Sequence, residues 1–215
     1  MRRWPDMSFV WRVCAGLALI LGTSLACAEA VNPRIQQVMS SPDALQKAQH
    51  DGKKAAAFCA NCHGNTGNST YDYIPNLAGQ HPGYLFNQIK KFADGRRQDR
   101  FMSGLIKAMK DEDRFNMAIY YANQRVQAAR PPEPDLVARG RQLYSQECKS
   151  CHGEKGYGGE NIARLAGQRP GYLVGALGKY QNGIKRRADP VMSSVARRLQ
   201  VSDIAALANY IVTMK

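Results

Sequence analysis

The chain contains Cys59-Ala60-Asn61-Cys62-His63 and, farther along, Cys148-Lys149-Ser150-Cys151-His152. Both stretches fit the motif C-x-x-C-H, which is typical of covalent c-type haem attachment. In that chemistry each cysteine sulfur adds to one vinyl group of the porphyrin, and the histidine that follows binds the iron from one side. The motif pair therefore predicts two covalently bound haem c groups. The predicted attachment residues are Cys59, Cys62, Cys148 and Cys151, and the predicted iron ligands are His63 and His152.

Zinc and dithiol chemistry fit this pattern less well. The two halves of a zinc ribbon are usually about 15–20 residues apart, whereas Cys62 and Cys148 are separated by 86 positions. Four cysteines would also complete a tetrahedral zinc site and leave both histidines unused. A thioredoxin-like dithiol would need a βαβ context, which the hydrophobic pattern does not indicate. Haem attachment is the interpretation that uses every residue of both motifs.

The first 30 residues predict export. A basic start with Arg2, Arg3 and Arg12 is combined with an apolar run, Val13 to Leu21, that is too short for a membrane-spanning helix. The sequence Ala28-Glu29-Ala30 then fits a signal-peptidase site. Residues 1–30 are therefore predicted to be a cleaved signal peptide, and the mature protein is expected in the periplasm.

The cysteine count agrees with this interpretation. Of six cysteines, Cys14 and Cys27 lie in the predicted signal peptide, and the other four all belong to the two motifs. An exported protein is free to form disulfides, but no mature cysteine is left for one.

The mature chain is predicted to form two domains. A proline-rich break at residues 127–135 interrupts it, and such a segment suits an extended linker. The predicted parts are an N-terminal domain, residues 31–129, a linker, residues 130–135, and a C-terminal domain, residues 136–215.

The two halves repeat each other. Residues 77–85 read L-A-G-Q-H-P-G-Y-L and residues 165–173 read L-A-G-Q-R-P-G-Y-L, so eight of nine residue types match. In each half, helical patterns precede the haem motif, follow this repeated stretch and occupy the end of the domain, with long loops between them. Glycines at 95 and 183 are expected to end the middle helices, and Ser202 is the expected N-cap of the last helix. The fold class is therefore all-α, with each domain packed around one haem.

The second iron ligand is predicted from the same self-comparison. Met102 and Met192 follow their motif histidines by 39 and 40 residues, and no other methionines align between the halves. Met109 and Met117 align with leucines and are expected in the core, while Met214 lies at the chain end. Met/His ligation is an established arrangement in electron-transfer cytochromes. Met102 and Met192 are thus the predicted distal ligands.

Together these motifs resemble the cytochrome c4 family, in which two class I cytochrome c domains are joined in tandem. The resemblance covers the mature chain and implies haem propionate edges that face each other across the domain interface. It also implies that a carbonyl two residues before L-A-G-Q accepts a hydrogen bond from the proximal histidine. Pro75 occupies that position in the first half, and Ala163 replaces the usual proline in the second. The repeated Gln80, Gln168, Tyr84 and Tyr172 either contact the propionates or shape the loop and first turn of the helix.

The expected function is electron transport and not catalysis, because paired methionines leave no open coordination site. The resemblance implies a periplasmic carrier of a respiratory chain that delivers electrons to a terminal oxidase. The alternative is a dihaem subunit of a periplasmic oxidoreductase, such as a flavocytochrome c sulfide dehydrogenase.

Charge predicts the kind of partner. The chain has a formal net charge of +13, and residues 31–130 and 131–215 each contribute +6. Such a field favours an acidic docking surface on a redox partner, such as an oxidase, or peripheral association with an anionic membrane. Basic runs such as Lys185-Arg186-Arg187 are expected on the docking surface. Nucleic acid is not an expected partner of an exported protein without a nucleic-acid-binding motif.

Overall fold

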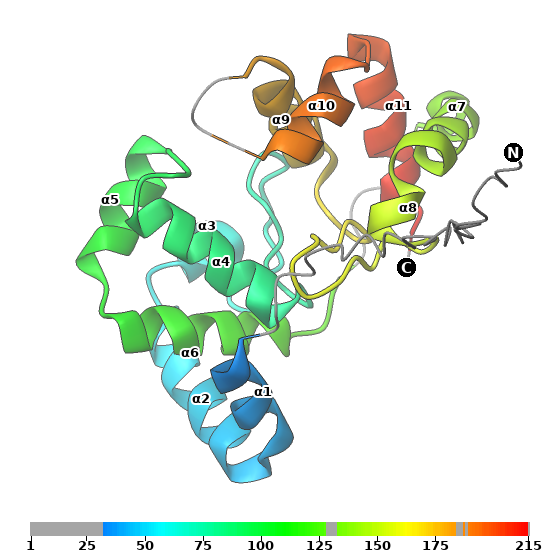
Figure 1. Cartoon of the computed structure of the whole chain (residues 1–215). Helices are drawn as coiled ribbons and strands as arrows, with labels where there is room; N and C mark the ends of the chain where they lie inside the picture. Colours follow the sequence, from blue (N-terminus) through cyan, green and yellow to red (C-terminus); the bar gives the residue numbers. More distant parts are fainter. Residues whose placement is uncertain (1–31, 128–132, 184–186, 188, 215) are drawn as a thin grey trace, which may run out of the picture. The chain divides into compact units, whose positions relative to one another are not determined.

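The computed structural model describes residues 32–127, 133–183, 187 and 189–214. In this part of the chain the regular structure is helical, with two isolated β-bridges and no strand (Figure 1). This confirms the predicted all-α class. The predicted signal peptide at 1–30 and residues 130–132 of the predicted linker lie outside the described residues. No described helix combines the length and apolar character needed to span a bilayer.

The two halves contain matching series of helices. The first half contains α1 (Pro33–Ser40), α2 (Pro42–Ala55), α3 (Ala60–His63), α4 (Pro82–Ala93), α5 (Arg100–Ala108) and α6 (Asp111–Ala122). The second contains α7 (Pro134–Glu147), α8 (Lys149–His152), α9 (Pro170–Gln181), α10 (Pro190–Arg197) and α11 (Val201–Val212). From α2 and α7 onward the elements correspond one to one, as the repeat predicts.

Proline begins many of these helices, because its fixed φ suits the first helical position and its missing N–H is not needed there. This moves one predicted boundary. The helix α7 begins at Pro134, so it includes the last two residues of the predicted linker 130–135.

The helix α1 was not predicted and has no counterpart among the described residues that precede α7. The Asn32 side chain accepts a hydrogen bond from the Arg34 amide at 3.0 Å, and Pro33 follows as the first helical residue. Ile35 is only 2% exposed and packs with Phe115 and Ile119 of α6. Tertiary burial of one side chain therefore holds a segment too short to be stable as an isolated helix.

Both predicted distal ligands lie on short helices that the sequence had suggested were loops. Asp99 caps α5 and Asp189 caps α10. Each carboxylate accepts a hydrogen bond from the backbone N–H of the methionine three residues later, at 3.1 Å for Met102 and 3.0 Å for Met192. A side chain that satisfies a free N–H in this way fixes where the helix begins. The two methionines thus occupy the same helical position in both halves.

The last helix begins differently from its prediction. Its N-cap is Gln200 and not Ser202, and Gln200 and Asp203 form a reciprocal capping box. The Asp203 carboxylate accepts the Gln200 N–H at 2.9 Å and also pairs with Arg139 of α7. This ion pair links the cap to another helix, which local sequence cannot reveal.

In each half, the helix before the haem motif packs closely against the last helix of that half (Figure 1). Glycine makes the close approach possible. A Cβ on Gly52 of α2 would lie 2.1 Å from the carbonyl oxygen of Asn116 in α6. A Cβ on Gly140 of α7 would lie 2.1 Å from the carbonyl oxygen of Ala206 in α11. Because backbone atoms cannot easily move aside, these two contacts set the spacing of the helices that frame each haem motif.

Replacing Gly140 by alanine is expected to destabilise the protein by about 1–3 kcal/mol, the usual range for overpacking a well-packed core. The control is Gly175→Ala in α9, where no atom lies within 4 Å of the added Cβ. That change should stabilise by about 0.5–1 kcal/mol, because alanine is the better helix former. Guanidinium unfolding of both variants measures the difference. Equal stability of the two would contradict the close helix contact.

Candidate functional site

The two motif histidines are buried and held in one orientation. His63 and His152 are each 7% exposed. The Nδ1 atom of His63 lies 2.9 Å from the Pro75 carbonyl oxygen, and that of His152 lies 2.9 Å from the Ala163 carbonyl oxygen. A carbonyl can only accept, so Nδ1 carries the proton and Nε2 keeps its lone pair. This is the neutral, oriented imidazole that metal coordination requires.

The electrostatic surroundings also keep both imidazoles neutral. Burial lowers the pKa of His63, and the carbonyl of Pro75 opposes this shift while the charge of Arg97 adds to it. Burial likewise lowers the pKa of His152. A buried ring that resists protonation stays available as a ligand at neutral pH.

The four motif cysteines form no disulfide with one another and belong to the same short segments as the histidines. Burial raises the pKa of Cys59, and it raises the pKa of Cys148 to about 12. Cys62 is half-buried and Cys151 is exposed. Each half therefore has two thiols and one imidazole with an available Nε2, which is the donor set that a covalent haem c group needs.

A glycine turn brings each carbonyl to its histidine. The carbonyl of Gly67 accepts the backbone N–H groups of Leu77 and Ala78, and the carbonyl of Gly156 accepts those of Leu165 and Ala166. Gly67 has φ 76° and Gly156 has φ 67°, a region that only glycine adopts readily. A Cβ on Gly67 would also lie 2.6 Å from the ring of Tyr121. These hydrogen bonds fix the start of each L-A-G-Q segment. They thereby also fix the carbonyls of Pro75 and Ala163, which lie two residues earlier and accept from the histidines.

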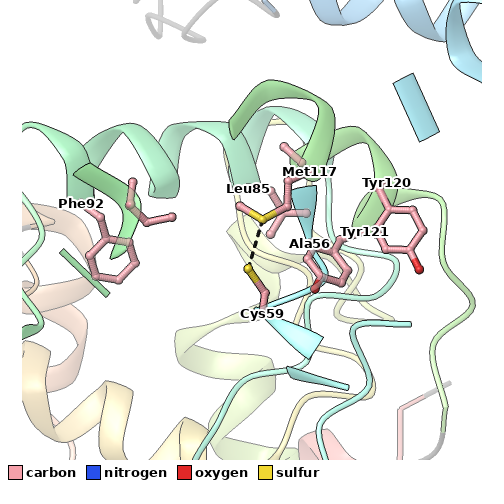
Figure 2. Close-up of a cluster of buried hydrophobic side chains, with 9 residues drawn as sticks. Ala56, Cys59, Leu85, Phe92, Met117, Tyr120 and Tyr121 are labelled. Atoms are coloured by element: carbon pink, nitrogen blue, oxygen red, sulfur yellow. Dashed lines mark hydrogen bonds between the residues drawn. The ribbon is translucent and has the colours of Figure 1, made fainter. Parts of the chain in front are cut away.

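The predicted distal ligands differ in their packing. Met102 is half-buried and packs against a hydrophobic cluster of the first half. Figure 2 shows buried members of this cluster, among them Cys59, Leu85 and Phe92. Met192 is also half-buried, but it is not among the side chains that pack against the corresponding cluster around Tyr144. The structure thus packs Met102 against the cluster that contains Cys59 of the first motif and shows no matching contact for Met192.

Met109, Met117 and Met214 pack in the cores, whereas Met39 is exposed. Met117 is 4% exposed, and the Cys59 Sγ atom lies 3.5 Å from its Sδ atom (Figure 2). Met109 packs against the same cluster. Met214 is 8% exposed, so it is better held than its position near the chain end suggests. A Cβ on Gly156 would lie 2.6 Å from its sulfur.

The repeated glutamines join the two halves. The side chain of Gln80 donates to the Arg164 carbonyl at 2.9 Å and accepts from the Arg164 N–H at 2.7 Å. The side chain of Gln168 does the same with the backbone of Asn76, at 3.0 and 2.8 Å. Both amides are therefore committed to the loop of the opposite half. This link between the halves is a role that neither of the two alternatives for these residues had named.

The expected docking run needs a correction. Arg187 is 8% exposed and lies over the rings of Tyr172 and Tyr180, because the surrounding aromatic rings cover its guanidinium. It is therefore not a docking residue, while Lys185 and Arg186 lie outside the described residues. Sequence reasoning missed the pairing of the half-buried Arg97 with the buried Arg187, although both precede a repeated methionine by five residues.

Comparison with known proteins agrees with this geometry. The family model "Cytochrome c" matches twice, over residues 49–124 and 137–215. A cytochrome c4 of Pseudomonas aeruginosa is 33% identical over 172 residues, which cover 74% of this chain and 85% of that protein. The crystal structure of reduced recombinant cytochrome c4 from Pseudomonas stutzeri superposes with a TM-score of 0.70 at 29% identity. That match covers 76% of this chain and 97% of the other.

A further relative has a different printed role. A thiosulfate dehydrogenase electron acceptor of Thiomonas intermedia is 32% identical over 171 residues, covering 73% of this chain and 78% of that protein. Two attachment motifs, two matches to the family model and similarity along most of the chain lead to one conclusion. The chain belongs to the cytochrome c4 family and is a dihaem c-type cytochrome, an electron carrier with two covalently bound haem c groups.

Proposed function

We propose that this protein is a periplasmic electron carrier of a respiratory chain and that it delivers electrons to a terminal oxidase. A bound haem c supplies a reversible one-electron couple between ferric and ferrous iron. The observation that carries the proposal is the pair of buried histidines, each with its Nδ1 hydrogen-bonded to a backbone carbonyl at 2.9 Å. Such an outer hydrogen bond orients the ring and makes the coordinating nitrogen more basic.

The proposed ligands leave no room for a substrate on the metal. His63 and Met102 would hold one iron, and His152 and Met192 the other. The common Asp cap gives both methionines the same helical position, which supports a shared role for them. With both axial positions taken, the protein would exchange electrons only through the haem periphery, as a carrier and not as an enzyme.

An exposed aromatic pair next to the first attachment motif is the proposed docking surface. Phe58 and Phe101 are each 58% exposed, and their ring centroids are 6.5 Å apart. They directly precede Cys59 and Met102 in the sequence, so both belong to the surroundings of the first haem. The exposed Lys54 lies one helical turn before Phe58, and the exposed Arg100 precedes Phe101.

Apolar rings bordered by cations suit a partner that has an apolar centre and an acidic rim. The second half lacks this pair, because Glu147 and Val191 take the corresponding places. Glu147 is also engaged in an ion pair with Arg198. The partner should therefore approach the first half.

A second candidate concerns the electron donor. The relative from Thiomonas intermedia is named as an electron acceptor of thiosulfate dehydrogenase. This supports a role as acceptor for a periplasmic dehydrogenase of sulfur compounds, including the subunit role in a sulfide dehydrogenase. Co-purification with such an enzyme would favour the subunit role over the free carrier.

Changing Cys148 and Cys151 to alanine should leave one haem, bound to the first half, because Cys59 and Cys62 remain. Mass spectrometry of the protein made with the c-type maturation machinery should show two haem masses for the unaltered chain and one for the variant. The matched variant, Cys59→Ala with Cys62→Ala, should keep only the second haem. Two haems in either variant would contradict the assignment of these cysteines.

Changing Met102 to histidine should remove part of the weak far-red sulfur-to-iron absorption of the ferric protein and lower one reduction potential. Thioether ligation raises the potential relative to a second histidine. Met192→His should do the same for the other haem, and Met109→Leu is the control. A spectrum altered by Met109→Leu but unchanged by Met102→Leu would show that the wrong methionine was assigned.

The bimolecular rate of electron transfer to an acidic acceptor should fall as ionic strength rises, because screening shortens the Debye length from about 10 Å at 0.1 M to about 3 Å at 1 M salt. Arg100→Glu should lower the rate at low salt by about tenfold, which lies within the range by which electrostatic steering changes association rates. Lys155→Glu makes the same charge change at an exposed site in the second half and should have a smaller effect. Stopped-flow kinetics measures both, and a rate independent of salt would reject the acidic partner.

A further inference from the structure

Four residues from duplicated positions meet at the contact between the two halves. Arg97 and Arg187 each precede a repeated methionine by five residues, and Tyr84 and Tyr172 occupy the same place in the repeated stretch. The backbones of Arg97 and Arg187 form an isolated antiparallel bridge. The duplication therefore brings two arginines side by side, one from each half.

Arg187 is buried with one donor unsatisfied. Its Nη2 donates to the Tyr172 hydroxyl at 2.8 Å, and its guanidinium lies 5.3 Å and 5.0 Å from the ring centroids of Tyr172 and Tyr180. The residue is only 8% exposed, and its buried Nε has no hydrogen-bond partner. An unsatisfied donor on a buried cation is costly, so this atom indicates a ligand.

The guanidinium of Arg97 also lies near the Tyr172 hydroxyl. Its Nη1 donates to Gln88 Oε1 at 2.8 Å, its guanidinium lies 4.3 Å from the centroid of Phe92, and its Nη2 lies 3.5 Å from the Tyr172 hydroxyl. Both guanidiniums thus converge on one hydroxyl. Among the described residues neither forms an ion pair. Asp189, the acidic residue of the adjoining pocket, already accepts the Met192 N–H as a helix cap.

The two guanidiniums stabilise negative charge at the Tyr172 hydroxyl, on which they converge. Burial by itself would raise the pKa of Tyr172, but the charges of Arg187 and Arg97 and their hydrogen bonds outweigh it and lower that pKa to about 8. A carboxylate, which is ionised at neutral pH and accepts from several donors, fits this surrounding better than a phenol does.

We propose that Arg97 and Arg187 form a carboxylate cradle that binds one propionate of each haem and thereby raises both reduction potentials. The proposal rests on the two haems and axial ligands assigned above. A haem joined to cysteines through its vinyl edge carries its propionates on the opposite edge. Arg97 stacks on Phe92, which shares a cluster with Cys59 and Met102, and Arg187 stacks on Tyr180 at the matching place of α9.

Electrostatics gives the direction of the effect. Ferric haem carries one more positive charge than ferrous haem, so a nearby guanidinium favours the ferrous state and raises the potential. The low dielectric of a buried site strengthens this interaction. Because the two arginines share one site, oxidation of one haem is felt at the other, and the cradle also couples the two halves.

The test is redox titration of the dihaem protein with Arg97→Gln and Arg187→Gln. Each variant should lower one potential so that the ferrous to ferric ratio at a fixed applied potential falls about tenfold, which is about 59 mV for a one-electron couple. Lys155→Gln removes the same charge from an exposed site outside the docking surface and should leave both potentials nearly unchanged. Arg187→Lys keeps the charge and should retain most of the potential.

Unchanged potentials in an Arg187→Gln protein that holds two haems would overturn the proposal. Equal loss of potential in Arg187→Lys and Arg187→Gln, together with loss of the far-red methionine band, would also overturn it, because the arginine would then be needed for local structure. If Arg187→Gln does not fold, the half-buried Arg97 is tested by Arg97→Gln, with Arg97→Lys as its conservative match. A wild-type protein without two haems or the far-red band would instead contradict the proposed function.

Discussion

The hydrogen bond from each motif histidine to a backbone carbonyl is the constraint on which the haem sites depend. It sets the tautomer of a buried imidazole and leaves Nε2 available as the proposed iron ligand. Each loop is turned back by a glycine with positive φ, Gly67 or Gly156. The carbonyl of that glycine accepts backbone N–H groups from the start of the L-A-G-Q segment, which brings the preceding carbonyl within reach of the histidine ring. A close helix contact at Gly52 or Gly140 then fixes the helix that leads into the motif. In each half, the loop, the packed helix pair and the motif histidine are therefore held in place by one another.

The two units are joined by reciprocal polar contacts and not by a large shared apolar core. Gln80 and Gln168 each satisfy both backbone groups of one residue in the opposite loop. The contacted residue in each loop, Arg164 or Asn76, directly follows the carbonyl that is bonded to the histidine of that half, so a contact between the halves lies close to each proposed proximal ligand. A change at one haem site can thus reach the other through few covalent and hydrogen-bonded steps.

The two halves also differ from each other, despite their duplication. Ala163 replaces the proline found at Pro75, yet both carbonyls lie 2.9 Å from their histidines, so the hydrogen bond does not require proline. At the surface, Phe58 and Phe101 have no aromatic counterparts in the second half. The sites that hold haem are thus similar, while the surfaces through which electrons would enter or leave are not. A carrier with two distinct faces can receive electrons at one half and release them at the other.

The sequence by itself determined the haem attachment residues, the all-α class, the duplication and the helices around the motifs, because these follow from local chemistry and from spacing within each half. Comparison of the two halves also predicted Met102 and Met192 as the distal ligands, which remains a prediction. Only the tertiary structure decided that α1 forms, since burial of Ile35 stabilises it. The same is true of the bonds that Gln80 and Gln168 make to the opposite half and of the burial of Arg187 within an apparently exposed basic run. These features depend on which groups from distant parts of the folded chain cover or hydrogen-bond a side chain, and hydrophobic periodicity does not encode those contacts.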